Sequence, residues 1–309
     1  MEYSLESWYA EFAKHTFPSK IIPLSPMFVN YLKSDGIQLP KPVNGGLLSK
    51  RDPRSKRAVS EDGWDEEDGE EEEGPYFEDL EVEITNAIQE LGGEVFPKLN
   101  FTCPRDAAWM TMGTLDCGTA GEVFLLLKSS DFIQHDLETV QANGLSPVLV
   151  LRKWKPNWNP AMEFRCMVVN SQLQFICQRD ASEFFPFLID PEFQSELMRR
   201  VSRFAEQVLL TKFPKPTFVF DVYVTPQRIW LVDLAPLLLL GEGSDPHPLV
   251  EWDELMSHQT EAVLRIVENT QSRNFAERRA LAMHRVPLDL VQGHVAPAFF
   301  EGKASDVII

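Results

Sequence analysis

Seven short apolar runs follow one another between Glu94 and Leu234, and turn-forming or charged residues separate them. In chain order they read EVFPKLN, EVFLLLK, PVLVLRKW, MEFRCMVV, LQFICQRD, TFVFDVYV and RIWLVDL. Runs of this length that are rich in Val, Ile and Phe predict β-strands. Asn170 and Ser171 separate the fourth run from the fifth, and this pair predicts a tight hairpin turn.

Helical spacing marks two longer segments that lie outside these runs. The first has apolar residues at Leu80, Ile84, Ile88 and Leu91, and Gly92-Gly93 predicts its C-terminal end. The second begins at Asp190 as the N-cap and Pro191 in the first turn, followed by a stripe of Phe193, Leu197, Val201, Phe204 and Val208. Successive hairpins with separate helices predict an α+β protein with mostly antiparallel sheets.

Two N-terminal segments differ from this pattern. Residues 1–43 place Trp8 and Phe12 on one face of a short helix, and the run SKIIPLSPMFVNYL predicts an extended segment docked between prolines. Residues 44–75 include the acidic block EDGWDEEDGEEEE, whose like charges repel one another. We expect this second segment to be a disordered insertion, either a plain spacer or a binding arm around Ser60.

Charge and composition narrow the function classes. The net charge of the 309 residues is -18, and about -8 remains without the acidic block, which argues against a nucleic-acid partner. No apolar run reaches the ~18 residues of a membrane span, and the first residues lack the apolar core of a secretory signal. The four cysteines form no C-x-x-C pair, which is typical of reduced thiols in a cytoplasmic protein.

Two aspartates stand inside apolar runs, where a carboxylate is costly to bury without a partner. If Pro226–Arg228 forms a three-residue loop, Asp221 lies opposite Asp233 on the same face of the sheet. Either a magnesium ion lies between the two acids, or each acid pairs with an arginine or lysine. A four-residue loop would instead place the two side chains on opposite faces. Strand alternation also puts Ala235 where a third oxygen ligand would stand.

Basic residues accompany the same runs. Lys98, Arg152, Lys153, Arg165 and Arg179 all lie in or beside predicted strands, and alternation puts Arg152 and Lys153 on opposite faces. Such residues are either exposed sheet charges or ligands of a metal-bound polyphosphate. The sequence has no P-loop, no G-x-G-x-x-G, no H-E-x-x-H and no G-x-S-x-G motif, so the corresponding sites are excluded.

In their order along the chain, VFPKLNFTCPRDAAWM, FLLLKSSDFI, LVLRKW, EFRCMV, QRD, FVFDVY and WLVDLAP resemble the cell division cycle protein 123 family. The resemblance implies an ATP-grasp-like fold with a small lobe over residues 76–146 and a large lobe with a C-terminal tail over residues 147–309. A nucleotide would bind in the cleft between the lobes. It also implies an assembly factor for eukaryotic translation initiation factor 2 (eIF2) that binds its gamma subunit. We expect a monomer without a catalytic nucleophile.

The resemblance also assigns site residues. It implies ATP contacts from Lys98, Val150, Leu151, Arg152, Lys153, Trp154, Arg165, Gln178, Arg179, Asp180, Asp221 and Asp233. Asp221 and Asp233 match the acids that bind magnesium in the family. The family's Asp-Phe-Asn-Pro is here Asp233-Leu234-Ala235-Pro236, so we expect nucleotide binding with weaker magnesium dependence. The alternatives are an ATP-dependent carboxylate ligase and a scaffold that has lost nucleotide binding.

Overall fold

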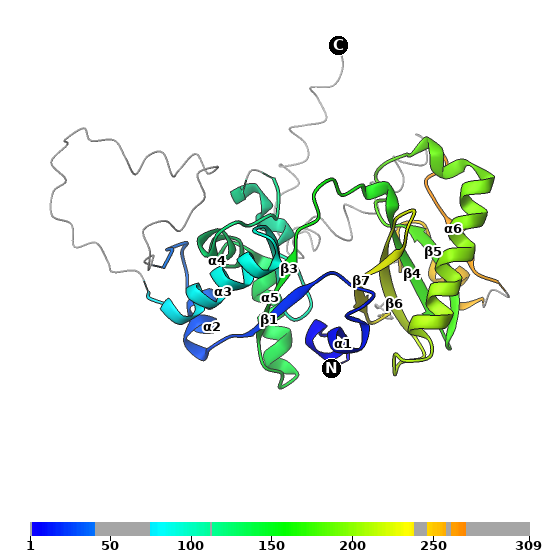
Figure 1. Cartoon of the computed structure of the whole chain (residues 1–309). Coiled ribbons are helices and arrows are strands. Elements are labelled where there is room, and N and C mark those ends of the chain that lie inside the picture. Colours follow the sequence, from blue (N-terminus) through cyan, green and yellow to red (C-terminus); the bar gives the residue numbers. More distant parts are fainter. Residues whose placement is uncertain (1, 41–74, 112, 238–245, 258–260, 270–309) are drawn as a thin grey trace, which may run out of the picture. The chain divides into compact units, whose positions relative to one another are not determined.

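The computed structural model describes residues 2–40, 75–111, 113–237, 246–257 and 261–269, which form two compact units (Figure 1). The first unit is Met1–Trp158 and the second is Asn159–Ile309. The expected acidic insertion, apart from residue 75, and the tail from residue 270 lie outside the described residues. Within the described residues, no helix is long and apolar enough to cross a membrane.

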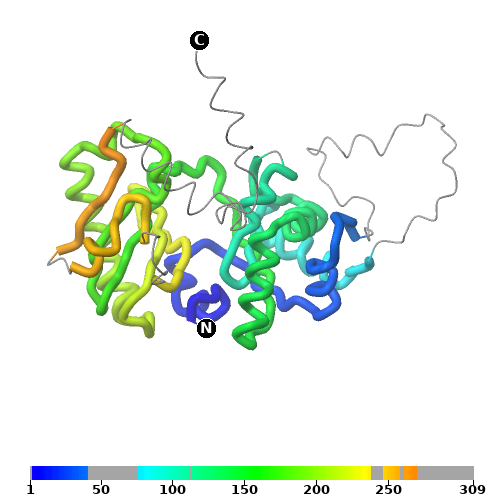
Figure 2. The backbone as a smooth tube through the Cα atoms, turned by 180° about the vertical axis from the view of Figure 1, so that it is seen from behind, coloured from blue at the N-terminus to red at the C-terminus, as the bar shows by residue number. Residues whose placement is uncertain are grey.

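The first unit is built on a three-stranded antiparallel sheet in the order β1-β3-β2. Figure 2 traces the backbone of both units from behind, from blue at the N-terminus to orange near residue 269. Its elements are α1 Leu5–Phe12, β1 Ser19–Pro23, α2 Pro26–Lys33, α3 Glu78–Leu91, β2 Val95–Lys98, η2 Arg105–Thr111, α4 Ala120–Lys128, α5 Asp131–Ala142 and β3 Val148–Lys153. The helices α3 and α4 pack against this sheet, and α2 packs against α4 and α5. The central strand β3 is buried from Val148 to Arg152.

The N-terminal segment is part of this unit. Trp8 and Phe12 lie on the buried face of α1, as the sequence predicts. β1 hydrogen-bonds to β3, so the segment docks on the chain's own core. The extended conformation predicted for SKIIPLSPMFVNYL holds for β1, but Ser25 caps α2 and Pro26 starts it, so the second half is helical.

The prediction of a strand for EVFLLLK is wrong, because these residues form α4. Thr119 and Glu122 make a reciprocal capping box at its N-terminus, and the helix is buried along its whole length. A continuous apolar run does not distinguish a buried strand from a buried helix. The T-x-x-E signature just before the run would have decided between them.

The second unit contains a five-stranded sheet in the order β7-β6-β4-β5-β8, antiparallel except for the pair β5 and β8. Its elements are η3 Pro160–Met162, β4 Glu163–Val169, β5 Gln172–Gln178, η4 Pro186–Ile189, α6 Pro191–Phe204, η5 Ala205–Leu209, β6 Phe218–Val224, β7 Ile229–Ala235, α7 Trp252–Met256 and β8 Val263–Arg265. α6 runs along one face of this sheet (Figure 1). The expected α+β organisation with mostly antiparallel sheets is confirmed.

Several local predictions are also confirmed. Asn170 and Ser171 both have positive φ, at 51° and 60°, as a two-residue hairpin between β4 and β5 requires. Asp190 accepts hydrogen bonds from the first turn of α6. Gly92 ends α3 with φ 108°, a conformation that glycine adopts most readily.

The strand β3 belongs to a different unit from the one that the sequence predicts. The sequence assigns residues from 147 onward to the second lobe, whereas β3 is the central strand of the first unit's sheet. The boundary between the two units follows Trp158. Of the predicted ATP contacts, Lys98 and residues 150–154 therefore belong to the first unit, and those from Arg165 onward belong to the second.

Candidate functional site: a charged row across the second sheet

The hairpin of β6 and β7 brings the two aspartates opposite each other, although not through the loop that the sequence predicts. The loop has four residues, Thr225–Arg228, because Val224 pairs with Ile229. A β-bulge then skips Val232, so that Leu231 pairs with Val222 and Asp233 pairs with Asp221. The bulge reverses the change of face that a four-residue loop alone would cause. The predicted pairing of Asp221 with Asp233 is confirmed, and the predicted loop is wrong.

A second bulge extends this pairing into a row across the whole sheet. In the hairpin of β4 and β5, Gln174 is skipped, so Arg165 pairs with Cys177. Arg165 also pairs with Asp221 on β6, and Cys177 pairs with Arg265 on β8. The row therefore reads Arg265, Cys177, Arg165, Asp221 and Asp233. The sequence predicts Arg165, Asp221 and Asp233 as site members. It misses Cys177, which reaches the face of Arg165 only through the bulge, and Arg265, which pairs with Cys177.

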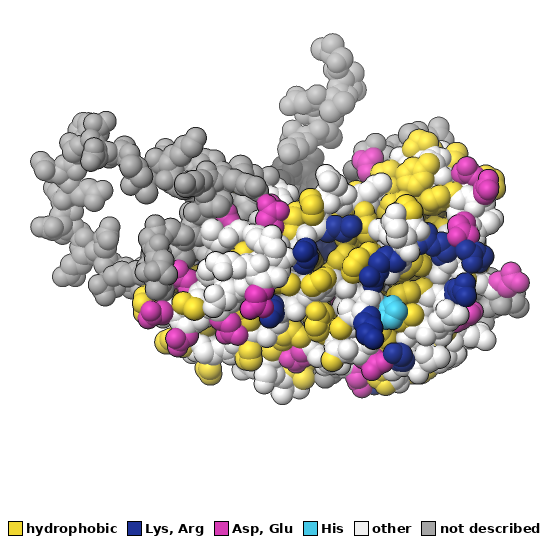
Figure 3. Space-filling model, viewed as in Figure 1, with side chains coloured by type: hydrophobic (Ala, Val, Ile, Leu, Met, Phe, Trp, Pro, Cys, Tyr) yellow, Lys and Arg dark blue, Asp and Glu magenta, His cyan; other side chains and the backbone are white. Residues whose placement is uncertain are grey.

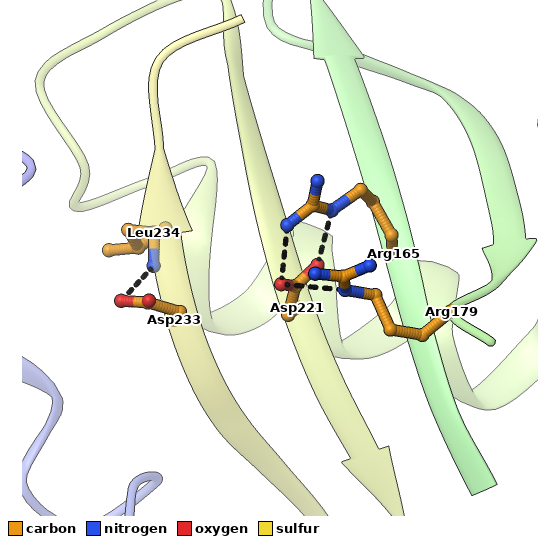
Figure 4. Close-up of polar contacts among 5 residues, drawn as sticks. All are labelled: Arg165, Arg179, Asp221, Asp233 and Leu234. Carbon is orange, nitrogen blue, oxygen red and sulfur yellow. Dashed lines mark hydrogen bonds and ion pairs between the residues drawn. The ribbon is translucent and has the colours of Figure 1, made fainter. Parts of the chain in front are cut away.

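Asp221 is the most strongly held carboxylate of the row (Figure 4). Arg165 Nε donates to Asp221 Oδ1 and Arg165 Nη2 donates to Asp221 Oδ2, both at 2.8 Å. Arg179 Nε lies 3.4 Å from Asp221 Oδ2. The exposed fraction is 7% for the Asp221 side chain and 17% for each arginine. A two-point guanidinium fork of this kind is among the strongest pairings of a carboxylate.

Electrostatics explain how a nearly buried arginine stays charged here. Burial by itself lowers the pKa of Arg165, because it disfavours the charged form. The charge and hydrogen bonds of Asp221, together with the charges of Asp233 and Glu163, outweigh burial and raise this pKa. Beside it, burial raises the pKa of the Cys177 thiol, so that the thiol is neutral at physiological pH.

Asp233 and Ala235 form the other end of the site. Asp233 Oδ1 accepts a hydrogen bond from the backbone N–H of Leu234 at 3.1 Å, and the side chain is half-buried (Figure 4). Ala235 packs against an apolar cluster that includes Met167 and Val219 on the same face of the sheet. Within the described ranges, no group of three or more His, Cys, Asp or Glu is placed to hold a metal. The two aspartates supply oxygen ligands of the kind that magnesium prefers, with no third one from position 235.

The turn after β5 holds the remaining predicted residues of the second unit. Gln178 Nε2 donates to the carbonyl oxygens of Asp180 and Glu183, and Gln178 Oε1 accepts from the N–H of Val267. Asp180 Oδ1 accepts from the N–H and hydroxyl of Ser182. Both side chains thus fix the turn that carries Arg179 toward Asp221.

In the first unit, two of the three predicted basic residues, Lys98 and Arg152, are buried. Lys98 is 2% exposed and Arg152 is 1% exposed, and Val150 and Leu151 are core residues. Arg152 Nη2 donates to Thr16 Oγ1 at 2.9 Å, and its guanidinium lies over the rings of Phe17 and Phe96.

The two residues that end this run have a different environment. Lys153 is exposed, which agrees with the prediction that Arg152 and Lys153 occupy opposite faces. The Trp154 ring meets the Phe96 ring edge-on at 6.3 Å. ATP contacts from these first-unit residues remain a prediction.

One face of the second unit carries a group of Lys and Arg side chains, although the chain as a whole is acidic (Figure 3). Ten of the chain's acids fall in EDGWDEEDGEEEE, which lies outside the described residues. Figure 3 shows Lys and Arg side chains gathered over the second unit in the view of Figure 1. An anionic ligand is therefore compatible with this unit, because local charge rather than net charge sets the field at a site.

These features define an α+β protein of two β-sheet units, with a row of paired charges across the sheet of the second. The sequence profile of the family described as D123 matches residues 8–294. A protein of Sclerotinia sclerotiorum described as translation initiation factor eIF2 assembly protein is 38% identical over 270 residues, which are 82% of this chain and 63% of that protein. A Dictyostelium discoideum protein with the same description is 32% identical over 92% of this chain and 81% of that protein. The chain belongs to the D123 family.

A solved structure agrees with this assignment. The structure of Cdc123 from Schizosaccharomyces pombe matches with a TM-score of 0.67 and 32% identity, over 87% of this chain and 96% of that chain. The resemblance drawn from the ordered motifs is therefore confirmed. The chain spans less than two thirds of the length of the Sclerotinia relative and of several Aspergillus relatives that it matches.

Proposed function

We propose that this chain is a cytoplasmic, ATP-binding assembly factor for eIF2 that acts by binding the gamma subunit. The charged row and the neighbouring Arg179 carry the proposal, because Asp221 and Asp233 lie beside the two guanidinium groups of Arg165 and Arg179. That combination suits a metal-bound polyphosphate, whose cation takes carboxylate oxygens and whose anionic oxygens take guanidinium groups. Membership of a family with members described as eIF2 assembly proteins supports the partner.

The residues have separate tasks in this proposal. Asp221 and Asp233 would hold magnesium, which supplies positive charge to the phosphates when bound. Arg165 and Arg179 would bind phosphate oxygens, while Gln178 and Asp180 keep the turn that carries Arg179 in place. Lys98 and the strand residues Val150 to Trp154 would provide the contacts from the first unit. The bound nucleotide would then set the shape of the surface that grips the gamma subunit.

Calorimetric titration of ATP and ADP into the purified chain, with magnesium and with EDTA, tests the nucleotide part. We expect binding in both buffers and a loss of affinity of about tenfold in EDTA, which Ala235 keeps small because one oxygen ligand is absent there. Ala235→Asn is the matched variant, and it should make ATP affinity depend more steeply on magnesium. No binding in any buffer would leave a scaffold that acts through protein contacts alone.

The partner part has its own test. We expect the purified gamma subunit of eIF2 to bind this chain, and ATP to change that affinity. Binding that is the same with ATP, with ADP and without nucleotide would separate assembly from nucleotide binding and count against the proposed coupling. Release of ADP that requires a carboxylate substrate would instead favour a ligase.

A further inference from the structure

Arg165 occupies the oxygen atoms that a metal ion would need. Its two nitrogen donors reach both Asp221 oxygens at 2.8 Å, and Arg179 Nε lies 3.4 Å from Oδ2. Asp221 is 7% exposed, so few directions remain from which a hydrated cation could approach it. A divalent cation at this place would also stand next to a guanidinium of like charge.

We propose that Arg165 gates the metal position: a divalent cation binds at Asp221 and Asp233 only after an anionic phosphate draws the Arg165 guanidinium away from Asp221. The inference rests on the proposed function, since the phosphate belongs to the bound nucleotide. Metal and nucleotide therefore enter together, and the nucleotide-free chain binds little divalent cation.

The exchange is chemically balanced for every group involved. A guanidinium fork fits a phosphate in the same two-point geometry as a carboxylate, so Arg165 changes partner without losing one. Asp221 exchanges one cation for another, so no buried charge is left uncompensated. Arg165 is 17% exposed, which leaves its side chain open to an incoming ligand on one side.

The arrangement of the row makes the gate specific to Arg165. Asp233 lies one strand further on, directly opposite Asp221, so the two carboxylates are neighbours on one face of the sheet. Arg165 makes the two-point fork with Asp221, whereas Arg179 makes one longer contact. By linkage, nucleotide raises the affinity for the cation by the same factor as the cation raises the affinity for nucleotide.

Mn²⁺ binding to the full chain, followed by electron paramagnetic resonance, tests the gate. The titrations use wild type, Arg165→Lys and Arg165→Gln, each without nucleotide and with a non-hydrolysable ATP analogue. Arg165→Lys keeps the charge but loses the fork, and it is the milder change if Arg165→Gln folds poorly. Arg199→Gln removes an arginine from an exposed pair with Glu196 on α6 and serves as the control. Asp221→Asn removes the shared ligand.

Three results would support the gate. Wild type and Arg199→Gln should bind Mn²⁺ weakly without nucleotide and at least about tenfold more tightly with the analogue. Arg165→Gln should bind Mn²⁺ about tenfold more tightly than wild type in the absence of nucleotide, and Arg165→Lys should fall between them. Asp221→Asn should lose the tight binding in both conditions.

Other results would overturn it. Wild-type binding of Mn²⁺ without nucleotide that equals its binding with the analogue would show that Arg165 does not obstruct the site. Arg165 variants that bind no more Mn²⁺ than wild type without nucleotide would show the same. The comparison of the Arg165 variants with wild type is made without nucleotide. The gate can therefore be refuted there even if calorimetry shows that wild type binds ATP. Absence of ATP binding would instead refute the proposed function.

Discussion

The two sheets each place an arginine in a nearly buried position on a strand, and they stabilise its charge in different ways. In the first unit, Arg152 on β3 lies over the rings of Phe17 and Phe96 and donates to the Thr16 hydroxyl. In the second unit, Arg165 on β4 binds both oxygens of Asp221. The first arrangement ties the N-terminal segment to its sheet, whereas the second keeps two exchangeable charges on an accessible face.

The difference shows which arginine can exchange its present partner for an anionic ligand without moving other residues. Aromatic rings and a hydroxyl surround Arg152 with contacts that a phosphate could replace only by displacing residues 16 and 17. A carboxylate partner can be exchanged, because phosphate offers the same geometry to the guanidinium and a metal ion offers the same charge to the acid. The residue type is the same at the two positions, but Arg152 is 1% exposed and the Arg165 side chain is 17% exposed, so both the partners and the exposure distinguish them.

Replacement of Arg165 should have the largest effect. Arg165→Met keeps much of the side-chain volume but removes the two-point fork on the Asp221 carboxylate, next to which Arg179 makes a longer contact. Removing one member of a buried ion pair costs about 3–5 kcal/mol. Urea unfolding at neutral pH measures the loss, with Arg199→Met as the exposed control that should change stability little. A loss no greater than that of the control would mean that Asp221 is compensated without Arg165.

Replacement of Arg152 should have a smaller effect. Arg152→Met retains the apolar packing on Phe17 and Phe96 but loses the cation–π contacts and the hydrogen bond to Thr16. We expect a loss of about 2 kcal/mol in the free energy of unfolding. The same urea titration measures it, together with the rate at which protease cuts the segment before β1. Equal losses for Arg152→Met and Arg165→Met would contradict the contrast between the two sheets.

The sequence predicts helix ends and turns where a single residue supplies the side-chain hydrogen bond or the backbone conformation that the position needs. Asp190 caps α6, Gly92 ends α3, and Asn170-Ser171 forms the hairpin turn because these residues tolerate the backbone that each position requires. The α4 helix was mistaken for a strand because both of its faces are buried, which removes the periodic signal. Local residue chemistry therefore predicts where a helix or turn begins and ends better than it predicts whether an apolar run is a helix or a strand.

The charged row was only partly predictable, because two bulges create it. Alternation without bulges would pair Arg165 with a neighbour of Cys177, and a four-residue loop would turn Asp233 away from Asp221. The bulges at Gln174 and Val232 each shift the strand register by one residue and so bring these side chains to one face. Neither glutamine nor valine is a residue type that predicts a bulge. A three-residue loop and a four-residue loop followed by a bulge at Val232 give the same pairing of Asp221 with Asp233. The bidentate pairing with Arg165 depends on the register between β4 and β6, which lie far apart in the sequence.

The smallest expected effect concerns Asp136, a buried carboxylate of the first unit that can be compared with Asp221 of the second. The donors to Asp136 in α5 are neutral groups: its Oδ2 accepts from the N–H groups of Phe101 and Thr102 and from the Thr102 hydroxyl. Its Oδ1 is buried without a donor among the described residues. Burial raises the pKa of Asp136 above 3.8, although those hydrogen bonds and the charge of Lys98 act in the opposite direction. The folded state therefore favours the protonated acid.

The sign of the pH effect follows from this raised pKa. Between the unfolded and folded pKa values the native chain holds more protons, so the contribution of Asp136 is complete below 3.8 and is lost as pH rises through the folded pKa. Asp136→Asn cannot titrate, and its amide resembles the protonated acid. The unfolding midpoint of wild type relative to Asp136→Asn should fall from about pH 4 to about pH 7 in urea titrations. A difference that stays constant with pH would mean that the hydrogen bonds from Thr102 and Phe101 balance burial, and one that rises with pH would mean that they outweigh it and hold Asp136 as an anion.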